Sequence, residues 1–183
     1  KALHMAELLK GTGNVEARDL TDYKVNLIQD NIMRSGMNNI EAVRWDATVL
    51  DEASIEKADI VIADLPCSGL GVLGKKTDLK YKATEEGCHE LAQLQRDILK
   101  VVQQYVKPGG LLIYSTCTIN PAENQDNVDW FLREHPQFEG MDIRDRLCRE
   151  LQQEVREDGS LQLLPGIHES DGFFIACMRK KEL

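Results

Sequence analysis

The pattern of hydrophobic and polar residues switches repeatedly between a helical period and short apolar runs. Apolar residues at helical spacing predict helices, and short apolar runs bounded by turn residues predict strands. The expected helices lie at 2–9, between Thr21 and Gly36, and from Thr84 to a stop at 107–110. The expected strands contain the runs 14–18, 40–45, 59–63, 111–113, 161–164 and 172–178. Strands that alternate with helices predict a doubly wound α/β sheet. We expect it to be mostly parallel, with an antiparallel strand at the end of the chain.

The expected strand at 59–63 is continuously apolar rather than alternating, because Ile-Val-Ile-Ala follows Asp59 without a polar interruption. A short continuous run of this kind predicts a strand that is buried on both faces.

Polar residues stand directly after four of the predicted strands. Asp19, Asp46, Asp64 and Cys117 each occupy such a strand end. In open α/β sheets, ligands bind beyond the carboxyl ends of the strands. Aspartate is also common in turns, so each of these residues taken alone is compatible with a simple turn or cap. The set together predicts a binding site along this edge of the sheet.

Cys117 lies between a predicted strand end and a predicted helix start. Asn120 is placed as an N-cap, Pro121 as the first helical residue, and Glu123 as the partner in a capping box. The positive end of a helix lowers the pKa of a nearby thiol, so this position favours a reactive cysteine. The competing interpretation is a small buried cysteine that fills the junction between strand and helix.

Composition narrows the class of protein. The chain has 183 residues, 42% hydrophobic and 29% charged, and a formal net charge of -9. One domain is the default at this length, and the negative charge argues against broad nonspecific binding of polyanions. A local exception is the loop that carries Lys75, Lys76, Lys80 and Lys82. No apolar run is long enough to span a bilayer, and we expect no membrane association.

The cysteines and histidines indicate no metal site. The five cysteines are widely spaced and form no CxxC pair, so we expect no zinc, and a reduced cytoplasmic setting is the natural inference. The four histidines are scattered and pair with no motif, which indicates structural or surface roles.

Two cysteine motifs carry a specific resemblance. They are Asp64-Leu-Pro-Cys67-Ser-Gly69 and Tyr114-Ser-Thr-Cys117, and together they resemble the paired motifs of the RNA cytosine-5 methyltransferases. Asp78-Leu-Lys-Tyr81, Leu91-Ala-Gln-Leu-Gln95, Lys107-Pro-Gly-Gly110, Leu163-Leu-Pro165 with His168, and Asp171-Gly-Phe-Phe174 extend the likeness over nearly the whole chain. The last two segments are similar to the tail of the Sun/Fmu type, which methylates 16S ribosomal RNA.

The resemblance implies a Rossmann-like class I methyltransferase that uses S-adenosylmethionine and binds ribosomal RNA. It implies that Cys117 is the nucleophile and that Cys67 assists product release. Lys1, Asp19, Asp46 and Asp64 would line the cofactor pocket, and Asp64 and Lys80 would contact the substrate. DNA cytosine-5 methyltransferases use the Pro-Cys thiol as nucleophile, so the two thiol roles remain open to exchange on chemical grounds.

The amino-terminal end departs from the family pattern. The glycine-rich cofactor loop of the family ends in Pro-Gly-Gly-Lys, of which only Lys1 would remain. We therefore expect residues 1–183 to form a single catalytic domain that is truncated at its amino end, without the first strand. The strand after Gly11 and the strand that ends at Asp64 would then lack the neighbour they normally share, leaving a gap in the sheet.

Three other interpretations compete with this one. An amino-methyltransferase would carry an Asp/Asn-Pro-Pro-aromatic loop in place of Asp64-Leu-Pro-Cys67, so a second proline and an aromatic residue are missing. That interpretation would also leave Cys117 unexplained. A noncatalytic RNA-binding or assembly module agrees with the lost glycine loop but not with the acidic charge. A thiol-redox protein is the weakest alternative, because no resolving cysteine lies near either motif in the sequence.

Overall fold

The computed structural model describes residues 1–75 and 83–182 and divides into two compact units, Lys1–Leu50 and Asp51–Leu183. Each unit has its own sheet: one holds β1 and β2, and the other holds the remaining strands. Among the described residues the strands therefore form two sheets instead of one. A gap in the sheet was expected from the sequence, and this division agrees with it.

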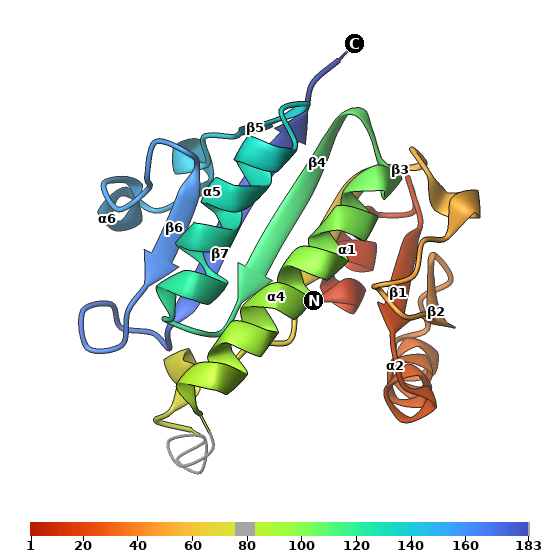
Figure 1. Ribbon diagram of the computed structural model, residues 1–183. Helices are drawn as coiled ribbons and strands as arrows, with labels where there is room; N and C mark the ends of the chain where they lie inside the picture. Colours follow the sequence, from red (N-terminus) through yellow and green to blue (C-terminus); the bar gives the residue numbers. More distant parts are fainter. Residues whose placement is uncertain (76–82, 183) are drawn as a thin grey trace. The chain divides into compact units, whose positions relative to one another are not determined.

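The first unit is a small parallel α/β layer. It comprises α1 (Ala2–Leu8), β1 (Val15–Asp19), α2 (Asp22–Ser35) and β2 (Ile40–Arg44) (Figure 1). The Thr21 side chain accepts a hydrogen bond from the N–H of Lys24 and so caps α2. Gly36 ends this helix in the left-handed conformation, with φ +68°, which glycine adopts without strain. Both predicted boundaries of this helix are confirmed.

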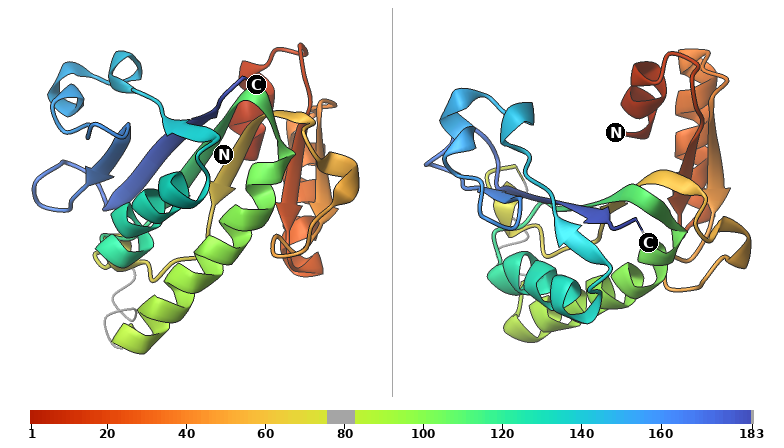
Figure 2. Two further views of the ribbon diagram at one scale, coloured as in Figure 1. Left: turned by 45° about the horizontal axis from the view of Figure 1, so that its top comes forward. Right: turned by 90° about the horizontal axis from the view of Figure 1, so that it is seen from above.

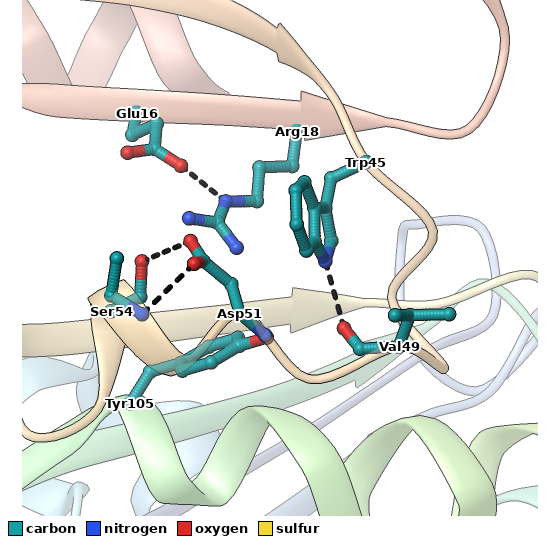
Figure 3. Close-up of polar contacts among 8 residues, drawn as sticks. Glu16, Arg18, Trp45, Val49, Asp51, Ser54 and Tyr105 are labelled. Atoms are coloured by element: carbon teal, nitrogen blue, oxygen red, sulfur yellow. Dashed lines mark hydrogen bonds and ion pairs between the residues drawn. The ribbon is translucent and has the colours of Figure 1, made fainter.

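Parallel pairing of β1 with β2 brings their carboxyl ends together. Asp19 is the register partner of Arg44, and the N–H of Trp45 donates to the Asp19 carbonyl at 3.0 Å. Side chains then hold the loop that follows β2, since the Trp45 indole donates to the Val49 carbonyl at 2.8 Å (Figure 3). The guanidinium of Arg18 lies 5.4 Å from the centre of the Trp45 ring and pairs with Glu16.

The second unit carries a five-stranded sheet. Its strands are β3 (Ala58–Asp64), β4 (Val106–Thr116), β5 (Phe138–Gly140), β6 (Ser160–Leu163) and β7 (Phe173–Lys180), in the order β3-β4-β7-β5, with β6 also paired to β7. β3 is parallel to β4, whereas β7 is antiparallel to β4, β5 and β6. Among the described strands of this sheet only β7 therefore runs against the others, and the predicted α/β fold with an antiparallel terminal strand is confirmed.

Helices complete this unit. They are α4 (Glu85–Val102), α5 (Gln125–Glu134), α6 (Arg149–Gln152) and the short 3-10 helices η1 (Glu52–Ser54), η2 (Leu70–Val72), η3 (Gln103–Tyr105), η4 (Pro121–Glu123) and η5 (Arg144–Arg146). As predicted, Thr84 caps α4 by accepting from the N–H of Gly87 at 3.1 Å. Asp51 caps η1 by accepting from the N–H of Ala53 at 3.1 Å, and its other carboxylate oxygen accepts from the Ser54 hydroxyl at 2.6 Å. The N–H of Asp51 donates to the Tyr105 hydroxyl at 2.9 Å (Figure 3).

The core forms on both faces of this sheet because side chains alternate along β4. α4 and α5 cover one face (Figures 1 and 2), where Leu112 and Tyr114 are fully buried. Their neighbours Leu111 and Ile113 point to the other face and pack against a cluster that contains Ile143 and Leu161. A strand paired on both sides and packed on both faces thus leads directly to Cys117.

Two expectations about the strands are wrong. β3 is not buried on both faces: it is the end strand of its sheet, and Ile60 is 54% exposed. The segment 107–110 does not stop the preceding helix, which already ends at Val102 and continues as η3. The segment bulges inside β4, because the pairing shifts from Ala58–Val106 to Ile60–Leu111.

Candidate active site

The loops after β3 and β4 bring two thiols together. Asp64 pairs with Ser115 in the parallel register, so both strands end at the same edge. Beyond this edge the sulfur of Cys67 lies 3.3 Å from the sulfur of Cys117. The backbone N–H of Cys117 also donates to the Cys67 sulfur at 3.3 Å. Both side chains are half-buried, so neither thiol is sealed in an apolar core.

The two thiols have unequal environments. Burial raises the pKa of the Cys67 thiol from about 9.0 to about 12, and the Cys117 side chain beside it acts in the same direction. Cys67 is therefore a neutral thiol near pH 7. With its sulfur accepting the N–H of Cys117, its own S–H is available to donate to the Cys117 sulfur.

A buried carboxylate joins the two cysteine loops. Glu123 is 0% exposed, and its Oε1 accepts from the Ser68 hydroxyl at 2.5 Å and from the Asn120 side-chain amide at 3.0 Å. Its Oε2 accepts from the Ser68 N–H at 2.8 Å and from the Gln95 side-chain amide at 3.1 Å. The Ser68 and Thr118 hydroxyls also lie 2.8 Å apart, which adds a second link between the loops.

Gln95 supports this carboxylate from α4. Its amide nitrogen also donates to the Pro66 carbonyl at 2.8 Å, one residue before Cys67. Its amide oxygen accepts from the Tyr114 hydroxyl at 3.1 Å and from the Asn127 amide at 2.9 Å. Burial raises the pKa of Tyr114 well above its usual range, so this hydroxyl is a proton donor. Tyr114 also donates to the Glu123 carbonyl.

A third loop closes against the other two through glycines. The N–H of Gly71 donates to the Cys117 carbonyl at 3.1 Å, and the N–H of Gly172 donates to the Gly71 carbonyl at 2.8 Å. A Cβ atom on Gly71 would lie 2.3 Å from the Gly172 carbonyl oxygen and 2.8 Å from that of Cys117. The absence of side chains therefore lets three backbones meet at the nucleophile.

The helix start predicted at Asn120 is only partly right. Asn120 does cap a helical turn by accepting from the N–H of Ala122, and Pro121 is its first residue. The turn is the single 3-10 helix η4, because Asn124 has the non-helical angles φ -116° and ψ -96°, and α5 begins only at Gln125. Glu123 forms no capping box, since its carboxylate turns to Ser68 and Gln95 instead. The expected α-helical dipole next to Cys117 is thus replaced by one short turn.

One of the two predicted substrate residues, Asp64, lies at this edge. Asp64 is exposed at the end of β3, and one of its oxygens accepts from the Ser115 hydroxyl at 3.0 Å. A pocket of about 230 Å³ lies beside Cys67, lined by Cys67, Ser68, Ala83, Thr84, Gly87, Cys88 and Leu91. Lys80 lies outside the described residues.

The other predicted cofactor residues belong to the first unit. Asp19 accepts from the N–H of Thr21 at 3.2 Å, and Asp46 accepts from the N–H and hydroxyl of Thr48 at 2.9 and 2.7 Å. The Thr48 hydrogen bonds hold the pKa of Asp46 below its usual value, so it is a carboxylate. In both residues these bonds go to Oδ1. Acceptors at neighbouring strand ends fit the hydroxyl groups of a ribose. Lys1 is the exposed N-cap residue of α1.

Comparison with known proteins identifies the family. The family model described as "16S rRNA methyltransferase RsmB/F" matches residues 1–179. The chain belongs to this family. The chain is 42% identical over 183 residues to "Probable ribosomal RNA small subunit methyltransferase B" of Bacillus subtilis, covering 99% of the chain and 41% of that protein. It is 33% identical over 180 residues to "Ribosomal RNA small subunit methyltransferase F" of Cronobacter sakazakii, covering 98% and 38%.

A solved structure gives the same result. NSun6 from Pyrococcus horikoshii, solved with SFG, matches with a TM-score of 0.81 and 28% identity, covering 99% of the chain and 45% of that protein. The chain thus spans about two fifths of the length of the curated relatives it matches. The RsmB/F family consists of S-adenosylmethionine-dependent methyltransferases, so the expected family, fold and cofactor are confirmed at this level.

The structure also corrects the reason given against a redox protein. Cys67 and Cys117 are distant in sequence, but each has the other thiol as its neighbour. Within 1–75 and 83–182, no helix combines the length and apolar character needed to cross a membrane. Over the same residues, no group of three His, Cys, Asp or Glu side chains is placed to hold a metal ion.

Sequence reasoning missed the polar support of the thiol pair. Gln95 lies among the buried positions Ala92, Ile98 and Leu99 of α4, so an amide on the apolar face of an amphipathic helix was a visible signal. Glu123 gave a misleading signal, because its spacing from Asn120 fits a capping box. Only the fold shows that Ser68, 55 residues earlier, is its partner.

Proposed function

We propose that this protein transfers a methyl group from S-adenosylmethionine to C5 of a cytosine in the 16S RNA of the small ribosomal subunit. Membership of the RsmB/F family supports the cofactor and the class of substrate. The observation that carries the C5 assignment is the thiol pair, with 3.3 Å between the sulfur atoms of Cys67 and Cys117 at the carboxyl edge of the sheet.

The pair matches the chemical need of a C5 transfer. C5 of cytosine is a weak nucleophile because the ring is aromatic. When the Cys117 thiolate adds to C6, an S–C6 bond forms and the electron pair of the C5=C6 bond moves to C5, which then carries enamine character. S-adenosylmethionine, when bound, supplies the electrophilic methyl group that C5 accepts. Cytosine is thereby activated through a covalent Cys117–C6 adduct.

Release reverses the first step. The proton on C5 leaves to a base, its electron pair restores the C5=C6 bond, and the C6–S bond breaks to return Cys117 as a thiolate. Cys67 assists by donating a hydrogen bond from its S–H to the departing sulfur. This role is supported by the short sulfur–sulfur distance and by the raised pKa that keeps Cys67 protonated. The same properties favour Cys117 over Cys67 as the nucleophile.

Carboxylates provide the remaining contacts. Asp64 accepts hydrogen bonds from the edge of the cytosine, which favours cytosine over uracil through its exocyclic amine. Asp19, Asp46, Asp64 and Lys1 would hold the cofactor, with the carboxylates accepting from hydroxyl donors. Lys80 is proposed to contact the substrate. The binding roles of Asp19, Asp46 and Asp64 are supported by the family resemblance and by their positions at strand ends. Those of Lys1 and Lys80 are supported by the resemblance alone.

Covalent trapping tests the proposal. RNA that contains 5-fluorocytosine blocks release, since fluorine replaces the C5 proton, so the complete protein should form a stable adduct. We expect Cys117→Ala to abolish the adduct and Cys67→Ala to retain it, whereas Cys148→Ala, which changes an exposed thiol, serves as the matched control. Adduct formation by Cys117→Ala but not by Cys67→Ala would exchange the two roles.

Product analysis separates the alternatives. Digested RNA should contain 5-methylcytosine, and N4-methylcytosine would instead indicate an amino-methyltransferase. A noncatalytic RNA-binding or assembly module would yield neither product and would not bind S-adenosylmethionine in an equilibrium measurement.

A further inference from the structure

One feature of the thiol site is not needed for the chemistry of attack. Glu123 is a completely buried carboxylate that touches neither sulfur in the described contacts, and it accepts four hydrogen bonds. A buried carboxylate costs solvation free energy, and replacement of buried charge by apolar groups is often neutral for stability. Its four hydrogen bonds use both carboxylate oxygens.

The donors connect Glu123 to both cysteine loops, but unequally. Two of the four hydrogen bonds come from Ser68, the residue directly after Cys67: one from its N–H and one from its hydroxyl. A third comes from Gln95, which also holds the carbonyl of Pro66, directly before Cys67. Glu123 and Gln95 therefore fix the backbone on each side of Cys67. The nucleophile side receives one bond, from Asn120.

This arrangement requires both side-chain oxygens of residue 123 to accept hydrogen bonds. The Ser68 N–H and the two side-chain amides are fixed donors, and each carboxylate oxygen receives at least one of them. A glutamine has the same shape but presents an NH₂ group to one side. In one orientation of the glutamine amide, its NH₂ group would face the Ser68 N–H and the Gln95 amide. In the other orientation it would face the Asn120 amide. The substitution therefore replaces a hydrogen bond by a contact between two donors without changing side-chain volume.

We propose that Glu123 is a positioning residue for product release: it fixes the Cys67 loop through Ser68 so that the Cys67 thiol reaches the departing Cys117 sulfur. This inference rests on the proposed function, in which Cys67 assists release. Weaker placement of Cys67 should slow release more than it slows the attack by Cys117, which directly follows β4, a strand paired on both sides with β3 and β7. The RNA–protein adduct should then accumulate on ordinary cytosine RNA.

The test compares Glu123→Gln with the unchanged complete protein on ordinary RNA in the presence of S-adenosylmethionine. A displacement of about 1 Å can cost about 100-fold in a catalytic step, so we expect turnover to fall by about 10- to 100-fold. Denaturing gels should show at least about a 10-fold rise in covalent adduct. Single-turnover attack on 5-fluorocytosine RNA should stay within about 3-fold. Adding Cys117→Ala should remove the adduct.

This readout separates positioning from simple destabilisation. A protein that is only less folded loses adduct and turnover together, and that result would overturn the inference. Ser68→Ala provides a second variant, because it removes one hydroxyl donor and keeps the N–H bond, so a smaller rise in adduct is expected. If neither variant raises the adduct, Glu123 does not act on release. Glu139→Gln, which changes an exposed glutamate on β5, should leave both quantities unchanged.

The cysteine variants keep this outcome distinct from failure of the proposed function. On ordinary RNA, Cys67→Ala should accumulate adduct and Cys117→Ala should form none. If these two variants behave as expected and Glu123→Gln does not accumulate adduct, only the role of Glu123 is refuted. If Cys67→Ala itself forms no adduct, the release role of Cys67 fails and the inference fails with it.

Discussion

The sulfur atoms of Cys67 and Cys117 lie 3.3 Å apart although the two residues are 50 positions apart in sequence. The parallel pairing of β3 with β4 creates this contact, because Asp64 and Ser115 are register partners and each cysteine follows within three residues of its strand partner. The N–H of Cys117 then fixes the geometry by donating to the Cys67 sulfur. The fold thus converts two separate strand ends into one thiol pair.

Mild oxidation should link Cys67 and Cys117 through a disulfide bond. A disulfide requires about 2.05 Å between sulfur atoms, so a small approach of the two loops suffices. With diamide as oxidant, two thiols lose two protons and two electrons, and diamide is reduced. We expect methylation to be lost and to return with a dithiol reductant, together with a Cys67–Cys117 linked peptide in mass spectrometry. Cys148→Ala should behave like the unchanged protein, whereas loss of activity without that peptide would contradict the proximity of the two sulfur atoms.

The raised pKa of Cys67 predicts a pH dependence of stability. Its ordinary value is 9.0 and its folded value is about 12, so the unfolded chain loses this proton first. Stability from the protonated thiol is fully present below pH 9 and is lost as the pH rises towards 12. The free energy of unfolding in urea should therefore fall between pH 9 and 10.5 more steeply for the unchanged protein than for Cys67→Ala. Parallel slopes would show that Cys67 has an ordinary pKa.

Much of the fold was predictable because local physical chemistry determined it. Thr21 and Thr84 are caps whose side chains accept from nearby N–H groups, and Gly36 ends a helix with a positive φ, all of which depend on a few adjacent residues. The closing antiparallel pair β6–β7 was also recognisable from its apolar runs. Cys67 and Cys117 were singled out by the resemblance of their two motifs to those of a known family.

Features that depend on distant partners were not predictable from the pattern. The exposure of Ile60 follows from the end position of β3 in its sheet, which a continuous apolar run does not reveal. The role of Glu123 depends on Ser68 and Gln95, which reach it from other elements. Local rules assigned Glu123 to a helix cap because they contain no term for such long-range donors.

The hydroxyl of Tyr114 should contribute measurably to stability. It is fully buried and donates to Gln95 and to the Glu123 carbonyl. Tyr114→Phe leaves buried acceptors without this donor, and we expect the free energy of unfolding to fall by about 1–3 kcal/mol. Tyr23→Phe is the matched control, since Tyr23 is 73% exposed. Equal stability of the two variants in urea unfolding would show that the Tyr114 hydroxyl adds nothing.

The close approach at Gly71 predicts that a single methyl group disrupts the nucleophile loop. A Cβ there would meet the carbonyl oxygens of Gly172 and Cys117 at 2.3 and 2.8 Å, both of which belong to backbone that cannot rotate away. Gly71→Ala should therefore cost at least about 1–3 kcal/mol in unfolding free energy and displace Cys117. Because displacement of a nucleophile by about 1 Å costs about 100-fold in rate, trapping on 5-fluorocytosine RNA should slow by a comparable factor even where the protein remains folded.

Gly74→Ala offers the matched control, since nothing lies within 4 Å of its added Cβ and both stability and trapping should be unchanged. Normal trapping by a folded Gly71→Ala protein would mean that the three-backbone contact does not set the position of Cys117.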